Sequence, residues 1–333
     1  YLARLRHCPE VLTSGPQVSE EISIPETGPS RLRLAAAGSF DGLTVEPCTR
    51  KQPPAGHVEI EVRATGLNFS DVLKALGLYP GIKDEIVPLG IECGGIVTRV
   101  GEGVDRFQVG DEVMGFSPYS FASHAITTEY ALVHKPASLD FEEAATVPIT
   151  FLTAYYGLVR LADIQPGERV LIHAAAGGVG LAAIQIAHHL GAEVYATAGS
   201  QQKRDYLRSL GVKHIFNSRT TDFAEQILEI TNREGVDVVL NSLPGDAIPK
   251  SLGILRAYGR FLEIGKTDIY SNRMIGLAPF QDNLSYFAID LDRMLRQRGD
   301  YIQKMFAEMM EFFGDDTYQP LPFIQFEYDE VRA

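Results

Sequence analysis

Apolar and polar residues alternate over the first third of the chain. From residue 31 to about residue 116, short alternating runs such as RLRLAAAG and HVEIEVRATGLN are broken by glycine and proline. A period of two is typical of strands with one buried face, so this part predicts a small, strongly bent β domain. A short helix is expected over residues 70–76, with Ser70 as its N-cap. Residues 1–29 show little periodicity and are expected to form an edge or linker region.

The spacing of the apolar residues changes after about residue 141. Residues 141–161 predict a helix that Pro148 interrupts, and residues 170–173 form an aliphatic run that is typical of a buried parallel strand. From there to residue 265, strands alternate with helical stretches, which is the order expected of a doubly wound parallel sheet. Helical spacing resumes over residues 290–313, and the final stretch predicts one more strand.

The turn between the first parallel strand and its helix points to a ligand. It reads HAAAGGVGLAAIQIA, with Gly177, Gly178 and Gly180 ahead of apolar residues at helical spacing. Glycines let the backbone approach a pyrophosphate, and a helix N-terminus offers it N–H groups and a positive dipole end. Alanine replaces the first glycine of the usual pattern, so the strand–turn–helix context carries the prediction of a dinucleotide site. An ordinary glycine turn is the alternative.

Composition and charge narrow the setting. The 333 residues suggest two domains, and a net charge of −13 argues against a nucleic-acid surface. No apolar run is long enough to span a membrane, and no signal peptide begins the chain, so we expect a cytoplasmic protein without membrane partners. The three cysteines lie far apart, without disulfide or metal spacing. Because the chain starts with tyrosine, we expect it to be part of a longer polypeptide.

The residues after the second parallel strand indicate which dinucleotide is bound. Folds that prefer NAD place a carboxylate there for the ribose hydroxyls, but this chain reads Ala-Gly-Ser at 198–200, followed by Lys203 and Arg204. The missing carboxylate and the added cations predict NADPH, with the 2′-phosphate held by Ser200 and Lys203. The alternative is a solvated helix face that carries Lys203 and Arg204.

Five motifs resemble the medium-chain dehydrogenase/reductase superfamily, and most closely the enoyl reductase domains of type I polyketide synthases and animal fatty acid synthase. They are LNFSDVLKALGLYPG, PLGIECGGIV, HAAAGGVGLAAIQIA, LNSLPG and GRFLEIGKTDI, in this order between residues 67 and 269. The resemblance implies an α/β fold with a GroES-like, β-rich substrate domain over 1–142 and an NADPH-binding Rossmann domain over 143–279. It also implies a return to the substrate domain over 280–333, which relatives extend further.

The resemblance also bears on metals. Alcohol-oxidising members hold a catalytic zinc through cysteine and histidine near the first two motifs, where this chain has Asn68 and Ile91. Neither is a zinc ligand, and the clustered cysteines of a structural zinc are missing, so we predict no metal. Without a Lewis acid, reduction of a double bond conjugated to a carbonyl fits better than alcohol oxidation, because it needs only hydride delivery and a stabilised enolate.

Three residues are candidates for catalysis. Lys266 follows a predicted strand at the edge where open α/β sheets bind ligands, and it could protonate or stabilise the enolate. The resemblance pairs this lysine with an aspartate, for which Asp290 matches best. Asp292 would lie on a different helix face, so we expect only one of the two to point to the site. The resemblance implicates Tyr79 in protonating the α-carbon, and Tyr79, Lys266 and water all remain possible donors. The alternatives are a surface lysine with two helix-terminal carboxylates, and a half-buried turn tyrosine.

The remaining cofactor contacts are implied by the resemblance. They are Asn68, Thr150 and Thr153 near the nicotinamide, Gly177, Gly178, Val179 and Gly180 at the pyrophosphate, Arg219 beside Ser200 and Lys203 at the 2′-phosphate, and Asn241, Leu243 and Gly265 in the last two motifs. His173 is expected to pack at the end of its strand rather than act as a base.

These features predict an NADPH-dependent enoyl reductase of polyketide or fatty acid chain extension. It would deliver hydride to the β-carbon and a proton to the α-carbon of a 2,3-enoyl thioester carried on the phosphopantetheine arm of an acyl carrier protein. Ketoreductase and dehydratase domains would be its neighbours. The rival functions are a stand-alone, zinc-independent quinone or enone oxidoreductase and a non-catalytic NADPH-binding protein.

Overall fold

The computed structural model describes residues 2–4, 28–80, 88–327 and 330, and these form two compact units. The first unit contains Tyr1–Ile149 and Arg293–Ala333, and the second contains Thr150–Asp292. The sequence predicted the crossings after residues 142 and 279, so both lie further along the chain than expected. The reason for the second difference is a strand, β14 (Ser285–Ala288), which pairs with the preceding strand of the second unit.

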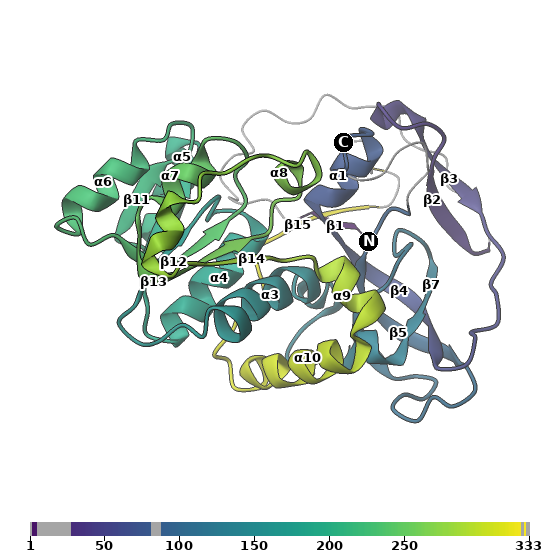
Figure 1. The fold of residues 1–333 in the computed structure, drawn as a ribbon. Helices are drawn as coiled ribbons and strands as arrows, with labels where there is room; N and C mark the ends of the chain where they lie inside the picture. Colours follow the sequence, from purple (N-terminus) through teal and green to yellow (C-terminus); the bar gives the residue numbers. More distant parts are fainter. Residues whose placement is uncertain (1, 5–27, 81–87, 328–329, 331–333) are drawn as a thin grey trace. The chain divides into compact units, whose positions relative to one another are not determined.

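The first unit is built on a seven-stranded sheet (Figure 1). One path through it runs β15 (Ile324–Phe326), β1 (Leu2–Arg4), β4 (His57–Leu67), β5 (Glu92–Val100), β6 (Glu112–Phe116) and β8 (Leu132–His134), and β7 (His124–Thr128) also pairs with β4. β2 (Ser30–Leu34) and β3 (Leu43–Pro47) form a separate antiparallel pair. The predicted bent β domain is confirmed. Part of the expected linker, Leu2–Arg4, instead adds a strand to the sheet, and residues 5–27 lie outside the described residues.

Along the chain, helices lie between these strands and between the two units. The chain also contains η2 (Phe40–Gly42), α1 (Phe69–Ala75), η3 (Glu129–Ala131), α2 (Phe141–Ala144), α3 (Pro148–Tyr155), η4 (Tyr156–Leu161), α9 (Leu291–Gln297) and α10 (Gly299–Gly314). Pro148 interrupts the predicted helix as expected, because it begins α3. The predicted N-cap Ser70 is wrong: Asn68 has extended backbone angles before α1, and its N–H donates to Asp71 Oδ2 over 3.1 Å. Asparagine followed three residues later by a carboxylate is the stronger start signal.

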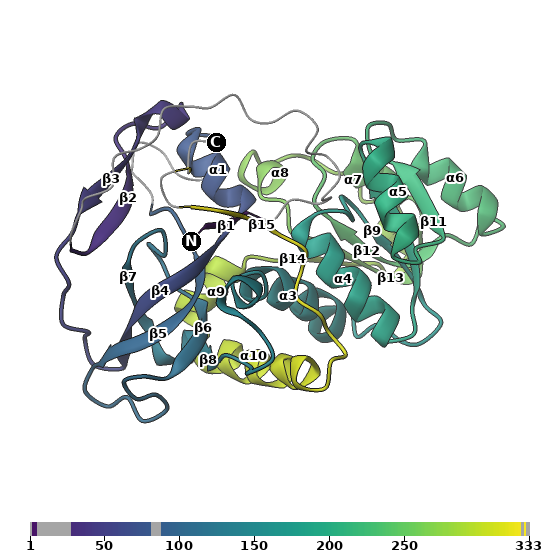
Figure 2. The same cartoon turned by 180° about the vertical axis from the view of Figure 1, so that it is seen from behind.

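The second unit holds a parallel sheet of six strands, seen from opposite sides in Figures 1 and 2. The strand order is β11 (His214–Asn217), β10 (Glu193–Ala198), β9 (Arg169–Ile172), β12 (Val236–Asn241), β13 (Leu255–Glu263) and β14. The connections contain α4 (Gly178–His189), α5 (Gln201–Ser209), α6 (Phe223–Ile230), α7 (Ala247–Leu252), α8 (Thr267–Tyr270) and η5 (Ala278–Asp282). The order reverses between β9 and β12, so a ligand site is expected at the carboxyl edge beside β9.

Aliphatic residues in the strands and a glycine in α4 allow the helices of the second unit to pack closely against its sheet. Val170, Leu171 and Ile172 of β9 are fully buried, in keeping with a strand covered on both faces. A side chain at Gly180 would bring its Cβ within 2.5 Å of the Ala175 carbonyl oxygen. Glycine at this position therefore allows α4 to pack closely against the end of its strand.

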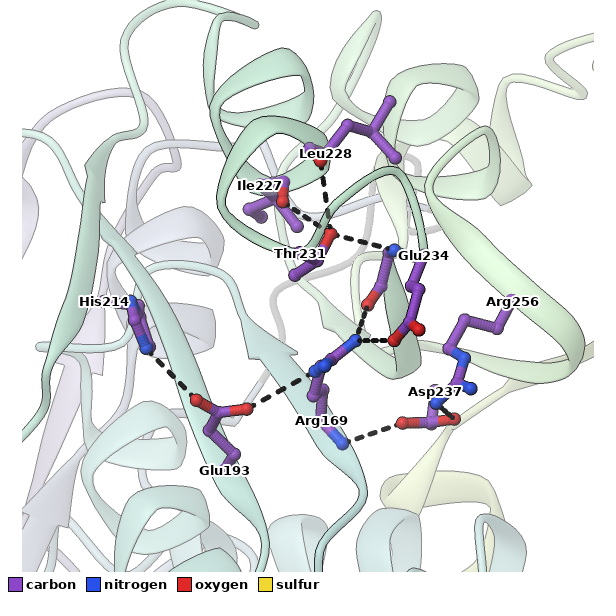
Figure 3. Close-up of polar contacts among 10 residues, drawn as sticks. Arg169, Glu193, His214, Ile227, Leu228, Thr231, Glu234, Asp237 and Arg256 are labelled. Carbon is purple, nitrogen blue, oxygen red and sulfur yellow. Dashed lines mark hydrogen bonds and ion pairs between the residues drawn. The ribbon is translucent and has the colours of Figure 1, made fainter.

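The amino edge of the parallel sheet is held by a network of charged groups (Figure 3). The Arg169 guanidinium lies 2.8 Å from Glu234 Oε2 and 3.4 Å from Glu193 Oε2. The carboxylate of Asp237 accepts the Arg169 backbone N–H over 2.8 Å and pairs with Arg256 over 3.2 Å. Because these groups lie at the edge away from the strand ends that carry the cofactor motifs, we assign them a structural role.

Candidate active site

The predicted dinucleotide turn joins β9 to α4. Gly177 is the N-cap of α4, Gly178, Val179 and Gly180 form its first turn, and the first intrahelical bond runs from the Leu181 N–H to the Gly177 carbonyl over 2.8 Å. The leading N–H groups of a helix have no acceptor within the helix. Together with the absence of side chains at three of these four positions, the turn fits a pyrophosphate.

A cationic corner lies where β10 and β11 end. Ala198 and Asn217 are paired in these two strands, so the residues that follow them emerge side by side. A Cβ at Gly199 would lie 2.7 Å from Arg219 Nε, which places the guanidinium over Gly199. The Ser200 hydroxyl caps α5 by accepting the Lys203 N–H over 3.3 Å. The structure therefore brings Ser200, Lys203 and Arg219 to one corner of the carboxyl edge.

Lys266 follows β13 and lies between two carboxylates. Its Nζ is 3.0 Å from Asp290 Oδ1 and 3.0 Å from Asp292 Oδ2. The expectation that only one aspartate would reach the site is wrong. Asp290 precedes α9 (Leu291–Gln297) and Asp292 lies in its first turn, so the rule for residues two apart within a helix does not apply to this pair.

Glu263 and Asn241 form a buried pair at the carboxyl edge of the parallel sheet. The sequence analysis identified only Asn241. Asn241 Nδ2 donates to Glu263 Oε2 over 2.6 Å and to the Leu243 carbonyl over 2.9 Å. The Gly265 N–H donates to Glu263 Oε1 over 2.6 Å. A carboxylate within the apolar strand sequence FLEIG was the signal that could have revealed Glu263.

A second buried carboxylate, Glu92, holds Asn68 in the first unit. Glu92 Oε1 accepts a hydrogen bond from Asn68 Nδ2 over 2.6 Å, and its Oε2 accepts one from the Ile149 N–H over 2.8 Å. Burial raises the pKa of Glu92 to about 8 and outweighs these two hydrogen bonds, which lower it. Ile149 lies in the same helix, α3, that carries Thr150 and Thr153, both buried and three residues apart. Sequence reasoning missed Glu92, although it stands in the GIECGG motif.

Glu92 leads to a prediction about stability and pH. Because its pKa rises from 4.5 to about 8 on folding, the folded chain binds this proton more tightly. The resulting stability is fully present below pH 4.5 and is lost as the pH rises through about 8. Between pH 6 and pH 9 we expect the free energy of unfolding to fall by roughly 1–3 kcal/mol more in the wild type than in Glu92→Gln, as measured with denaturant. An equal loss in both proteins would mean that Glu92 titrates in its usual range.

Tyr79 lies in the first unit, just after α1. It is half-buried, and the Lys74 ammonium is 5.7 Å from the centroid of its ring, a cation–π distance. Lys74 Nζ is also 3.6 Å from Asp71 Oδ1. Tyr79 and Asn68 thus belong to one unit, whereas Lys266 and its two aspartates belong to the other.

His173 lies at the end of β9, at the carboxyl edge of the parallel sheet. His173 is buried, its ring nitrogens lie 3.0 Å from the Thr197 hydroxyl and 2.8 Å from the Ser251 hydroxyl, and burial lowers its pKa to about 3. The expected packing role of His173 is confirmed. Over the described ranges, no three His, Cys, Asp or Glu side chains are grouped as they would be to hold a metal ion. Nor does any described helix combine the length and apolar character needed to cross a bilayer.

Comparison with known proteins agrees with this architecture. Residues 54–139 match the family described as alcohol dehydrogenase GroES-like domain, and residues 178–312 match the family described as zinc-binding dehydrogenase. A GroES-like unit combined with a parallel dinucleotide-binding sheet defines a medium-chain dehydrogenase/reductase, which confirms the predicted fold class.

Individual relatives narrow the class. The chain is 41% identical over 339 residues to a phenolphthiocerol/phthiocerol polyketide synthase of Mycobacterium tuberculosis, a match that covers 99% of this chain but 15% of that protein. It is similar to the crystal structure of CurK enoyl reductase, with 47% identity, a TM-score of 0.82 and coverage of 89% of this chain and 91% of the other. Escherichia coli quinone oxidoreductase complexed with NADPH matches with 30% identity and a TM-score of 0.76, over 86% of this chain and 89% of that one. The chain belongs to the enoyl reductases of this superfamily.

Proposed function

We propose that this chain reduces the 2,3-double bond of enoyl thioesters with NADPH during polyketide chain extension. The observation that carries the proposal is the placement of Lys266 and its two aspartates at the same carboxyl sheet edge as the glycine turn. The relatives support it, because they include polyketide synthases and an enoyl reductase.

The coenzyme would lie across the ends of β9, β10, β12 and β13. The first turn of α4 would bind the pyrophosphate, and Ser200, Lys203 and Arg219 would bind the 2′-phosphate. NADPH, when bound, supplies the hydride that adds to the β-carbon. The E. coli quinone oxidoreductase supports this coenzyme, because its structure is a complex with NADPH.

Lys266 would stabilise the enolate that hydride addition leaves on the thioester. Two carboxylates at 3.0 Å hold its ammonium group in place, so that it can donate to the developing oxyanion. The α-carbon then takes a proton from Lys266, Tyr79 or water. If Tyr79 is the donor, Tyr79→Phe should change the configuration of the α-carbon in a product made from an α-methyl substrate. An unchanged configuration would leave Lys266 or water as the donor.

The substrate would arrive on the phosphopantetheine arm of an acyl carrier protein. The Mycobacterium tuberculosis relative is a polyketide synthase of which this chain matches 15%, and ketoreductase and dehydratase domains would be its neighbours in such a protein. A covalent tether raises the local substrate concentration, so an acidic chain need not bind the carrier tightly.

Turnover assays test this function. The purified chain is incubated with NADPH and either crotonyl pantetheine or a quinone, and coenzyme oxidation is followed. We expect oxidation that depends on the thioester and is at least about tenfold faster than with the quinone. Reduction of the quinone alone would identify a quinone oxidoreductase instead. NADPH binding without turnover of either substrate would identify a non-catalytic protein.

A further inference from the structure

Glu263 is a buried carboxylate at the end of β13, three residues before Lys266. Only 2% of the residue is exposed, and the two residues before it, Phe261 and Leu262, are completely buried. An ionisable side chain in such surroundings costs several kcal/mol unless hydrogen bonds compensate it. The contacts of its two oxygens therefore show why a carboxylate is tolerated there.

Each oxygen of Glu263 accepts one hydrogen bond, and the two donors come from different loops. Oε2 accepts from Asn241 Nδ2 at the end of β12, and Oε1 accepts from the Gly265 N–H after β13, both over 2.6 Å. Asn241 in turn binds both backbone groups of Leu243, donating to its carbonyl over 2.9 Å and accepting its N–H over 3.2 Å. One carboxylate thus connects the backbone of residues 241–243 to that of residues 265–266.

These two loops leave the sheet at the same edge, because β12 and β13 are neighbouring parallel strands. Both carry candidate contacts of the coenzyme, and Gly265 is directly followed by Lys266. The fit is close: a Cβ at Gly265 would lie 2.7 Å from Glu263 Oε1. A change in Glu263 is therefore transmitted to the backbone that carries the catalytic lysine.

We propose that Glu263 is a positioning residue, which fixes the two loops against each other and so sets where Lys266 stands relative to the bound nicotinamide. This inference rests on the proposed reductase function. Positioning is worth a large factor in rate, since a displacement of about 1 Å can lower turnover by roughly 100-fold.

If Glu263 positions Lys266, kcat should depend on the protonation state of Glu263. Burial raises the pKa of Glu263 to about 7, with the Asp268 carboxylate adding to the rise, while hydrogen bonds from Asn241 and Gly265 oppose it. Tyr286 on β14, whose own pKa burial raises to about 12, is a further titratable neighbour, and Lys266 follows three residues later in the chain. Because both partners of Glu263 are donors, the carboxylate makes both bonds, and protonation weakens one. We expect kcat to fall as the pH drops below about 7.

The test replaces Glu263 with glutamine. Its amide can accept from Gly265 but then directs N–H groups at the Asn241 amide, so we expect kcat for crotonyl pantetheine to fall by about 30-fold. The Kd of NADPH, measured by its fluorescence, should stay within about threefold of the wild type. The acid limb of the kcat profile near pH 7 should disappear, which a loss of stability alone would not produce.

A second variant exchanges donor and acceptor in the hydrogen bond between residues 241 and 263. In the double variant Glu263→Gln, Asn241→Asp, the new amide donates to the new carboxylate, and acceptors for the Gly265 and Leu243 N–H groups are retained. Only the Leu243 carbonyl loses a donor, the one that Asn241 Nδ2 supplies in the wild type. We expect it to recover kcat to within about fivefold of the wild type. The matched control is Asp237→Asn, which changes another carboxylate that joins a backbone N–H to a side chain, but at the amino edge (Figure 3). It should leave kcat unchanged.

The outcomes separate the two proposals. A wild-type chain that does not reduce the thioester refutes the reductase function. If the wild type is active, a Glu263→Gln enzyme with wild-type kcat and an unchanged acid limb overturns the positioning role. If Glu263→Gln does not fold, a folded double variant with recovered kcat supports the role, and one that is folded but inactive overturns it.

Discussion

Replacement of Lys266 by methionine is expected to lower kcat for enoyl thioester reduction by about 100- to 1,000-fold, the usual cost of removing one donor to a developing oxyanion. Methionine keeps most of the length of the side chain but removes the ammonium group that lies 3.0 Å from both Asp290 and Asp292. The enolate then loses its positive neighbour. Steady-state kinetics with crotonyl pantetheine measure the loss, and the KM of the thioester should change much less than kcat.

The two aspartates provide a graded comparison. Because both carboxylates contact the lysine, Asp290→Asn or Asp292→Asn alone should cost less than the methionine substitution, and both together should approach it. NADPH binding should persist in all of these variants. A Lys266→Met enzyme that retains more than about a third of wild-type kcat would show that the lysine is only a structural partner of the two aspartates.

Removal of the two cations at the 2′-phosphate corner, through Lys203→Ala with Arg219→Ala, is expected to raise the Kd of NADPH by about 100-fold. Each charge-assisted hydrogen bond contributes about 1.5–3 kcal/mol, and about 1.4 kcal/mol corresponds to a factor of ten. NADH has no 2′-phosphate, so its Kd should change by less than about threefold. Fluorescence titration with both coenzymes measures this shift in preference.

A surface arginine on the same helix serves as the control. Arg208 pairs with Asp205 in the last turn of α5, away from the helix start that Ser200 caps. Arg208→Ala should leave both dissociation constants unchanged. If the double variant loses NADPH and NADH equally, Lys203 and Arg219 stabilise the adenosine end or the fold, and the preference for the phosphate must arise elsewhere.

The pattern of the sequence was sufficient to predict most strands and helices of both units. Period-two runs identified β4 and β5, and the change to helical spacing after a glycine turn identified β9 and α4. The second compact unit extends beyond residue 279 because it includes β14, a strand of four residues that is too short for its pattern to show which sheet it joins. The choice of Ser70 as N-cap failed because its neighbour Asn68 competes for the same role.

The sequence predicted some residues of the candidate site and missed others, for a physical reason. Glycines and lysines at strand ends can be recognised from local sequence, because the chemistry of the turn depends on them. Glu92 and Glu263 were missed because a carboxylate in an apolar stretch indicates burial, but the sequence does not show which donors it binds. The donors to Glu263 are Asn241, in another strand, and Gly265, and spacing along the chain gives no measure of those distances. The lysine's contact with both aspartates likewise depended on the residue at which α9 begins.

The fate of a labelled hydride tests the proposed chemistry most directly. The wild-type chain is given NADPH carrying deuterium at the transferable position of the nicotinamide, together with crotonyl pantetheine in ordinary water, and the product is examined by NMR. Transfer to the thioester predicts one deuterium at the β-carbon and none at the α-carbon, whose new hydrogen comes from solvent-exchangeable groups. A saturated product without deuterium at the β-carbon, or oxidised coenzyme without a saturated product, would contradict it.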